Sequence, residues 1–299
     1  MLLMFIRADK LLSRSYDSFR TYHVLSFYWD DFVPRLHLYD IGEKKVKEIE
    51  LKELAFSSSH EKYCVGHFRG SEYVPCPISA RVTRFSQCSY CASSWIPHQE
   101  CIFEPKCNGE LCSCDFCSKH HVVYAAVIRD TVKIGMTGES RLRTRGIEQG
   151  ADAILQLVKC DGRLEARNFE KRIGKILHLP QLIGSEASSK CFMRPPPRAE
   201  IEELLISVRD RLSKELQVID SEILFLDRYP IDHYLDSPLE PNLPSGIHTG
   251  KVLGVKGRFL LYQDEITNQY RVLDLSDLPC RYISELHERD NYRNEDVPI

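Results

Sequence analysis

Cysteine is the residue type whose number and spacing most directly indicate chemistry in this chain. The sequence has 299 residues and 12 cysteines, and nine of the cysteines fall between residues 61 and 119. Two pairs, Cys88 with Cys91 and Cys114 with Cys117, have the spacing Cys-x-x-Cys. Such a turn directs two thiolates toward one point, which suits a tetrahedral metal ion. The segment has few apolar runs, so bound metal would supply the stability that a small core cannot.

We expect two structural metal sites, because four thiolates close a tetrahedral coordination shell. The first predicted site consists of Cys64, Cys76, Cys88 and Cys91. The second predicted site consists of Cys101, Cys107, Cys112 and Cys117, with Cys114, His120 or His121 as possible substitutes. Zinc is favoured over an iron–sulfur cluster because the spacing matches no ferredoxin pattern, although the same ligands serve both. A redox role is less favoured, since no βαβ pattern surrounds either pair.

A carboxylate between arginines is the second feature with chemical potential. Arg163, Arg167 and Glu170 follow one another at spacings of four and three residues. They form a stripe beside the apolar positions of a helix expected from about residue 163 to residue 178. Taken alone, this pattern is typical of a surface ion pair worth only about 0.2–0.5 kcal/mol.

The elements before this helix form a recognisable order. Residues 122–128 and 131–135 are β-branched, apolar runs separated by Arg129 and Asp130, which predicts a β-hairpin. A short Arg-rich helix then precedes a third predicted strand at residues 153–160. The helix that carries Glu170 follows this strand.

This order resembles the GIY-YIG nuclease superfamily, which has a three-stranded antiparallel sheet flanked by helices. Val122-Val123-Tyr124 stands at its first motif and Lys133-Ile134-Gly135 at its second, followed by Thr137. Lys133 replaces the second tyrosine of the motif, as in branches with a Lys-Ile-Gly-x-Thr string, which include some restriction enzymes. Arg145 stands on the first helix, and Glu170 stands at the metal-ligand position of the later one.

A more specific resemblance covers residues 64–177 and returns near residues 250–261. The run from Arg145 to Ala151 is similar to the Arg-x-x-Asp-Gln-Gly-Ala string of an uncharacterised prokaryotic family. That family is a domain of unknown function and couples a cysteine-rich segment to a GIY-YIG-like core. This resemblance implies a fold, but it does not supply an activity.

The superfamily resemblance implies Mg²⁺-dependent phosphodiester cleavage of DNA or RNA. Glu170 would hold the Mg²⁺, and Arg145 would neutralise a phosphate oxygen. Tyr124 would position or deprotonate the attacking water, while Lys133 would lower the pKa of Tyr124 or act as the base itself. Two other functions stay open: nucleic-acid binding without cleavage, and a zinc-stabilised scaffold for protein partners.

We therefore expect an α+β protein with a GIY-YIG-like core, a preceding zinc module and β-rich parts at either end. The expected segments are residues 1–60 (β-rich), 61–119 (cysteine-rich), 120–217 (core plus a packing helix) and 218–299 (β-rich). Between residues 120 and 180, 11 Lys and Arg stand against 7 Asp and Glu, although the whole chain has a net charge of −3. Local basicity favours a nucleic-acid partner. No run is long enough for a membrane span or a signal peptide, so we expect a cytoplasmic location.

Overall fold

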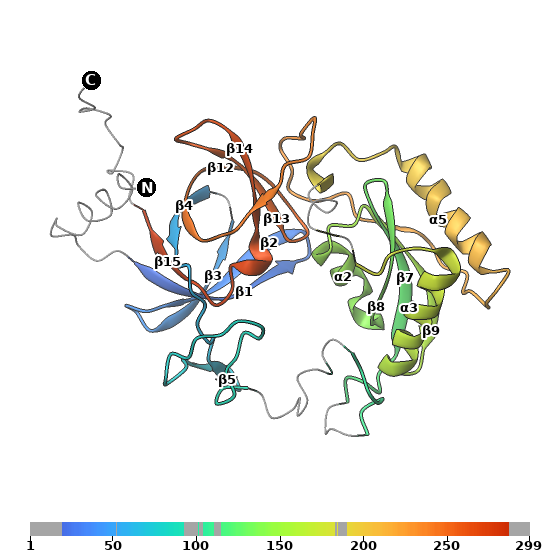
Figure 1. The fold of residues 1–299 in the computed structure, drawn as a ribbon, viewed down its shortest axis with the longest axis horizontal. Coiled ribbons are helices and arrows are strands. Elements are labelled where there is room, and N and C mark those ends of the chain that lie inside the picture. The colour runs from blue at the N-terminus through green and yellow to red at the C-terminus, as the bar shows by residue number, and fades with distance from the viewer. Residues whose placement is uncertain are drawn as a thin grey trace.

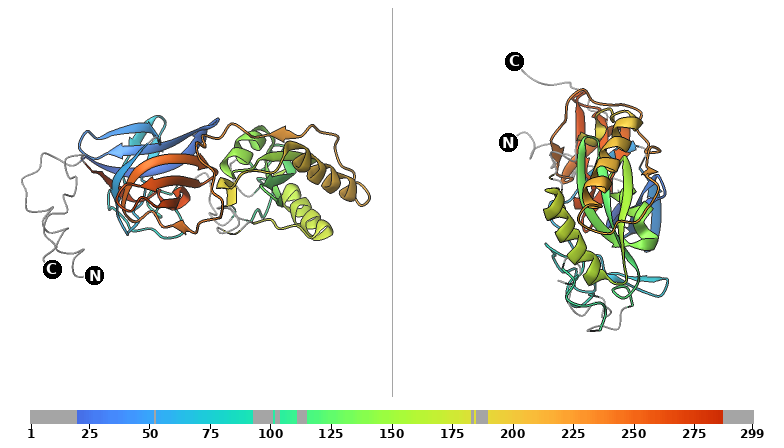
Figure 2. Two further views of the ribbon diagram at one scale, coloured as in Figure 1. Left: turned by 90° about the horizontal axis from the view of Figure 1, so that it is seen from above. Right: turned by 90° about the vertical axis from the view of Figure 1, so that its right-hand side faces the viewer.

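The computed structural model describes residues 20–51, 53–92, 101, 104–110, 115–182, 184 and 190–286. These residues form an α+β fold that is rich in β-sheet and has few helices (Figure 1). Two sheets lie at opposite ends of an elongated molecule, and a small hairpin projects beside the larger sheet (Figures 1 and 2).

The larger sheet combines strands from both ends of the chain. Its order is β11-β14-β13-β12-β4-β15-β1-β2-β3. The bounds are β1 (Thr21–Asp30), β2 (Val33–Asp40), β3 (Lys45–Glu50), β4 (Glu53–Ser58), β11 (Pro241–Asn242), β12 (Gly246–Lys256), β13 (Phe259–Asp264), β14 (Tyr270–Asp274) and β15 (Tyr282–Glu285). Strand β2 buries every second residue, because a strand directs successive side chains to opposite faces.

The strands predicted at both ends of the chain are present, and the structure joins them in one sheet. Strand β4 pairs with β12 and with β15, so residues 53–58 lie between two strands that follow residue 245. Strand β15 also pairs with β1. The N-terminal and C-terminal β-rich segments therefore share one apolar core.

The smaller sheet contains β7 (His121–Ile128), β8 (Thr131–Gly138), β9 (Ala153–Cys160) and β10 (Leu224–Phe225). Its order is β10-β9-β7-β8, and all neighbouring strands are antiparallel. The predicted hairpin and third strand are present, and β10 adds a short strand that the sequence did not predict. The hairpin turn is stabilised by Asp152, whose Oδ2 accepts a hydrogen bond from the Arg129 amide at 2.5 Å.

Helices cover both faces of the smaller sheet. Helix α3 (Arg163–Leu177) and helix α5 (Arg198–Leu212) pack on one face, where Val123, Ala125 and Val127 of β7 are fully buried. Fully burying one valine side chain contributes about 1.5–3 kcal/mol, so this apolar contact, rather than surface charge, holds α3 in place.

On the other face, Tyr124, Ala126 and Ile128 join the core of the larger sheet. Helix α2 (Leu142–Glu148), which follows the 3₁₀ turn η2 (Glu139–Arg141), lies between the two sheets (Figure 1). Two further 3₁₀ turns are η3 (Lys190–Phe192) and η4 (Leu275–Asp277). None of the helices in the described ranges is both long and apolar enough to cross a membrane.

Candidate functional site

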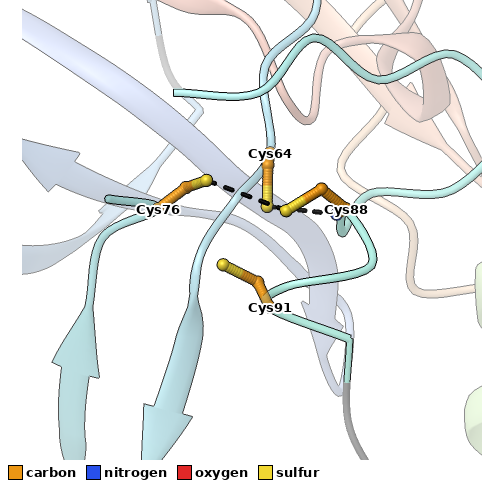
Figure 3. A group of neighbouring side chains, drawn as sticks. All are labelled: Cys64, Cys76, Cys88 and Cys91. Carbon is orange, nitrogen blue, oxygen red and sulfur yellow. Dashed lines mark hydrogen bonds between the residues drawn. The ribbon is translucent and has the colours of Figure 1, made fainter. Parts of the chain in front are cut away.

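Four cysteine side chains meet beside the small hairpin formed by β5 (His67–Arg69) and β6 (Glu72–Val74) (Figure 3). The Sγ atoms of Cys64, Cys76, Cys88 and Cys91 all lie within 4.8 Å of one another. The Sγ atoms of Cys76 and Cys88 are 3.8 Å apart, and the Cys88 amide donates a hydrogen bond to the Cys64 Sγ at 3.2 Å. These are the four residues of the first predicted site, and the structure confirms that they come together.

Local backbone geometry explains how the four thiols meet. Cys64 and Cys76 flank the β5–β6 hairpin, in which His67 pairs with Val74. Gly66 has φ +67°, and a Cβ at this position would lie only 2.3 Å from the Val74 carbonyl oxygen. Only glycine fits such a close backbone approach at positive φ. The hairpin can therefore bring Cys76, which follows β6, back beside Cys64, which precedes β5.

The donor set is suited to a metal ion. Although burial opposes its ionisation, hydrogen bonds from the Ala80 and Ile78 amides lower the pKa of Cys76 to about 7. Burial raises the pKa values of Cys64 and Cys91, whose thiols would need a bound cation to ionise near neutral pH. Four thiolates at this separation could bind one zinc ion, and they would leave no coordination position for a substrate.

The second predicted metal set lies only partly within the described residues. Cys112 lies outside them, as does Cys114. Cys101, Cys107 and Cys117 are described, and they do not form a tight donor group like that of the first site within the described part of the chain. The prediction of a second ion with the ligand Cys112 stays a prediction.

The four predicted catalytic side chains are brought together around the hairpin of β7 and β8. Tyr124 pairs with Gly135, and Ala126 pairs with Lys133. Tyr124 and Ala126 are two residues apart on β7 and therefore share one face of the sheet. Lys133 lies directly opposite Ala126, so its side chain is on the same face as that of Tyr124. A Cβ at Gly135 would lie 2.6 Å from the Tyr124 hydroxyl, so the glycine of the Lys-Ile-Gly motif leaves the space that the phenol ring occupies.

Gln149, which is not among the predicted site residues, connects three of them. Its amide lies 2.9 Å from the Tyr124 hydroxyl. With the amide oriented so that Nε2 donates to Tyr124, Oε1 accepts hydrogen bonds from Arg145 Nε at 3.1 Å and from Lys133 Nζ at 3.3 Å. Arg145 and Gln149 are four residues apart, a spacing that places both on one side of α2. That spacing is the sequence signal that could have identified Gln149.

Burial and neighbouring charges set the pKa values of the site. Burial raises the pKa of Tyr124 to about 12, with Arg145 opposing and Glu170 reinforcing the shift. Burial lowers the pKa of Lys133 to about 8, with Arg145 reinforcing and Glu170 opposing the shift. Since both charges act on both groups, the four predicted residues share one electrostatic environment.

Glu170 is buried as well as paired, whereas its spacing from Arg167 alone is typical of an exposed ion pair. Its side chain is 8% exposed, and its Oε2 accepts a hydrogen bond from Arg167 Nη1 at 2.5 Å. Arg167 also donates to Gln181 at 2.9 Å and to Glu104 at 3.0 Å. Arg167 and Glu170 are therefore more than an exposed surface pair, because the guanidinium directly covers the carboxylate.

The larger sheet contacts the site at Gln149, the residue that follows α2. The turn between β12 and β13 contains Gly257 at φ +58°, where a Cβ would lie 2.9 Å from the Gln149 carbonyl carbon. Next to it, Lys256 and Asp152 form an ion pair in which both side chains are less than a tenth exposed. The end of α2 is thus held against the turn of another sheet, which positions Gln149.

Fold and sites together define an α+β protein with a four-cysteine cluster able to hold zinc. The chain belongs to the family described as "Protein of unknown function (DUF2797)", which matches residues 52–275. The match includes the cysteine cluster, the smaller sheet and five of the nine strands of the larger sheet. No curated protein and no solved structure matches the chain.

Proposed function

We propose that this protein cleaves phosphodiester bonds in nucleic acid as a GIY-YIG-like nuclease. One observation carries the proposal: the Gln149 side chain connects Tyr124, Lys133 and Arg145 by hydrogen bonds. Glu170 acts electrostatically on Tyr124 and Lys133 from α3. The four predicted residues come from two strands and two helices, so the folded chain, and not local sequence, brings them together. Titratable groups with shifted pKa values that gather at one place are typical of functional sites.

Lys133 is the better candidate for the general base. With a pKa of about 8, a substantial fraction of its amine is unprotonated near pH 8 and could accept a proton from water. Tyr124, with a pKa of about 12, stays protonated and would donate a hydrogen bond to the attacking water or to the phosphate. The pKa values therefore assign different tasks to the two residues.

Arg145 would contact the substrate first. Its side chain is 43% exposed, whereas Tyr124 is fully buried and Lys133 is 7% exposed. A planar guanidinium is suited to bind two phosphate oxygens at once. The scissile phosphate would thus be held at the open side of the site, with the amine of Lys133 behind it.

The carboxylate of Glu170 fits a hard cation such as Mg²⁺, which binds oxygen ligands and keeps several of its waters. When bound, Mg²⁺ would stabilise the negative charge that develops during cleavage. Arg167 Nη1 contacts the same carboxylate at 2.5 Å, so this guanidinium would have to turn away from Glu170 before a cation could bind.

That ion pair favours a second candidate function, in which the protein binds nucleic acid without cleaving it. If Arg167 stays on Glu170, the carboxylate is neutralised and the arginine-rich helix α2 can still contact phosphates. Binding would then depend on salt, with a slope that reflects the number of phosphates contacted.

The test is a cleavage assay on single-stranded and double-stranded DNA and RNA, with Mg²⁺ or Mn²⁺ added. We expect the wild-type protein to cleave at least one substrate, and we expect Glu170→Gln to abolish cleavage. Glu203→Gln is the matched control, because Glu203 is an exposed carboxylate on α5, and it should cleave normally.

Two other results would overturn the proposal. Salt-sensitive binding by wild type and Glu170→Gln alike, without cleavage by either, would assign the binding function instead. If the protein neither binds nor cleaves any of these substrates, nucleic acid is excluded as the partner. The protein-scaffold function would then remain.

A further inference from the structure

His121 begins strand β7 and has one ring nitrogen without a hydrogen-bond partner among the described residues. The residue is 1% exposed. Its Nδ1 lies 2.8 Å from the Lys119 carbonyl oxygen. Because a carbonyl only accepts, Nδ1 carries the proton. In the neutral ring Nε2 then presents a lone pair, and this atom is buried without a partner.

An arrangement of this kind is typical of a metal ligand. A histidine that binds a metal through one nitrogen usually donates the other N–H to a carbonyl or a carboxylate. Leaving a buried acceptor without a partner costs the free energy of its lost hydration, so a native fold generally provides a partner. A metal ion at Nε2 would be such a partner.

Three cysteine-bearing segments are anchored beside His121, at the start of α3. Arg163 donates to the Cys117 carbonyl oxygen at 2.8 Å through its amide, and to the Cys101 carbonyl oxygen at 2.7 Å through its side chain. Arg163 also acts electrostatically on His121. The Phe116 ring, next to Cys117, lies 5.2 Å from the His121 ring.

The segment that carries Cys107 reaches the same place. Asn108 Oδ1 accepts a hydrogen bond from the Leu164 amide at 3.0 Å. A Cβ on Gly162 would lie 2.5 Å from this oxygen, so the glycine is what allows the close approach. The Cys107 Sγ accepts a hydrogen bond from the Gly109 amide at 3.4 Å, an arrangement that also stabilises a thiolate.

We propose a second zinc site in which His121 Nε2 binds the ion together with the thiolates of Cys101, Cys107 and Cys117. Among the described residues these thiols are not gathered as they are in the first site, so they would close around the ion when it binds. One imidazole and three thiolates form a donor set that zinc commonly takes in structural sites. Such a site has a net charge of −1. Arg163 Nη1 lies 3.9 Å from the Cys117 Sγ and would offset this charge. The fourth ligand is then His121 and not Cys112.

The site would join the cysteine-rich segment to the first strand of the smaller sheet and to the start of α3. Glu104, in that segment, contacts Arg167 and Lys171 on α3. A second ion would therefore fix the segment that contacts the residues around Glu170. The proposal is independent of whether the protein cleaves nucleic acid.

The experiment measures zinc per chain in the full-length protein by mass spectrometry, with the ligand types determined by X-ray absorption at the zinc edge. We expect two zinc ions in the wild-type protein, with seven sulfur ligands at about 2.3 Å and one nitrogen at about 2.0–2.1 Å. His121→Ala should keep one ion, bound by sulfur alone. Cys76→Ser should also keep one ion, and its ligands should include the nitrogen.

Further variants distinguish the loss of a zinc ligand from misfolding of the protein. His121→Cys should restore two ions with sulfur ligands only, which a merely damaged fold would not do. His120→Ala is the matched control, because His120 is adjacent and its side chain is 57% exposed, and it should keep two ions. The proposal is overturned if the wild type binds one ion, if His121→Ala keeps two, or if Cys112→Ser loses the second ion while His121→Ala does not.

Discussion

At the scale of single residues, Lys133 lies in surroundings that disfavour its own charge. It is 7% exposed, and burial lowers its pKa from 10.5 to about 8. Each unit of pKa shift corresponds to about 1.4 kcal/mol, so the protonated amine destabilises the fold by about 2–4 kcal/mol at pH 7. A residue that weakens the fold to this extent is expected where chemistry requires it.

We predict that Lys133→Met stabilises the protein at pH 7 by about 1–3 kcal/mol and removes the proposed cleavage activity. Below pH 8 the lysine is protonated in the folded and in the unfolded chain, so its full cost is present. Between pH 8 and 10.5 the unfolded chain binds more protons, and the free energy of unfolding therefore rises with pH. Lys133→Met should lack this part of the rise in urea titrations.

Lys159→Met is the control for this prediction, because Lys159 lies on β9 in the same sheet and its side chain is 46% exposed. It should change the free energy of unfolding at pH 7 by less than about 1 kcal/mol. A Lys133→Met protein that is less stable than the wild type at pH 7 would show that the buried amine is a net stabilising group.

At the scale of elements, α3 carries both the proposed cation ligand and the group that competes for it. Arg167 and Glu170 are one turn apart, so the helix itself holds the guanidinium against the carboxylate. Glu104 accepts a hydrogen bond from the same guanidinium. It would hold the Arg167 side chain when the guanidinium turns away from Glu170. The position of the Arg167 guanidinium would therefore determine whether the proposed cation can bind to Glu170.

We predict that Arg167→Gln lowers the Mn²⁺ concentration needed for half-saturation several-fold, because a cation no longer competes with a bound guanidinium. The measurement is the electron paramagnetic resonance signal of free Mn²⁺ during titration, which does not depend on activity. Arg172→Gln, an exposed change on the same helix, should have no effect. Weaker Mn²⁺ binding by Arg167→Gln would mean that the arginine orients Glu170 for the cation.

Local elements were predictable from the sequence because their signals are local. The hairpin of β7 and β8, strand β9 and helix α3 follow from apolar periodicity, and the Cys-x-x-Cys turn identified half of the first metal cluster. Two features of the site were not predictable. The contacts of Gln149 depend on how α2 packs against the sheet, and the partner Glu104 belongs to a segment with no periodic pattern.

At the scale of the whole molecule, the larger sheet and the candidate site meet at two glycines. Gly150 and Gly257 both have positive φ, and a Cβ on Gly257 would lie 2.8 Å from the Gly150 amide nitrogen. The turn of one sheet therefore sets the position of Gln149, which contacts residues of the other sheet. Stability and site geometry are coupled at this contact.

We predict that Gly257→Ala destabilises the protein by about 2–4 kcal/mol, since strain at positive φ adds to the clash with the backbone of Gly150. Activity should fall in the fraction that stays folded, because the end of α2 is displaced. Gly70→Ala is the matched control: Gly70 has φ +61° and no atom within 4 Å of the added Cβ. It should cost only about 1–2 kcal/mol and leave activity intact. Equal effects of the two changes would contradict a coupling through this contact.

The mixed order of the larger sheet also determines the sequence of events during synthesis of the chain. Strand β4 ends at Ser58 and lies between β12, which begins at Gly246, and β15, which begins at Tyr282, so both of its neighbours are synthesised long after it. The smaller sheet, whose β7, β8 and β9 are close in sequence, can form earlier. Because pairing distant segments is slow, β1 to β4 wait with unpaired edges while the middle of the chain folds. We expect closure of the larger sheet to be the last and slowest step of folding, and the candidate site to reach its final geometry only then.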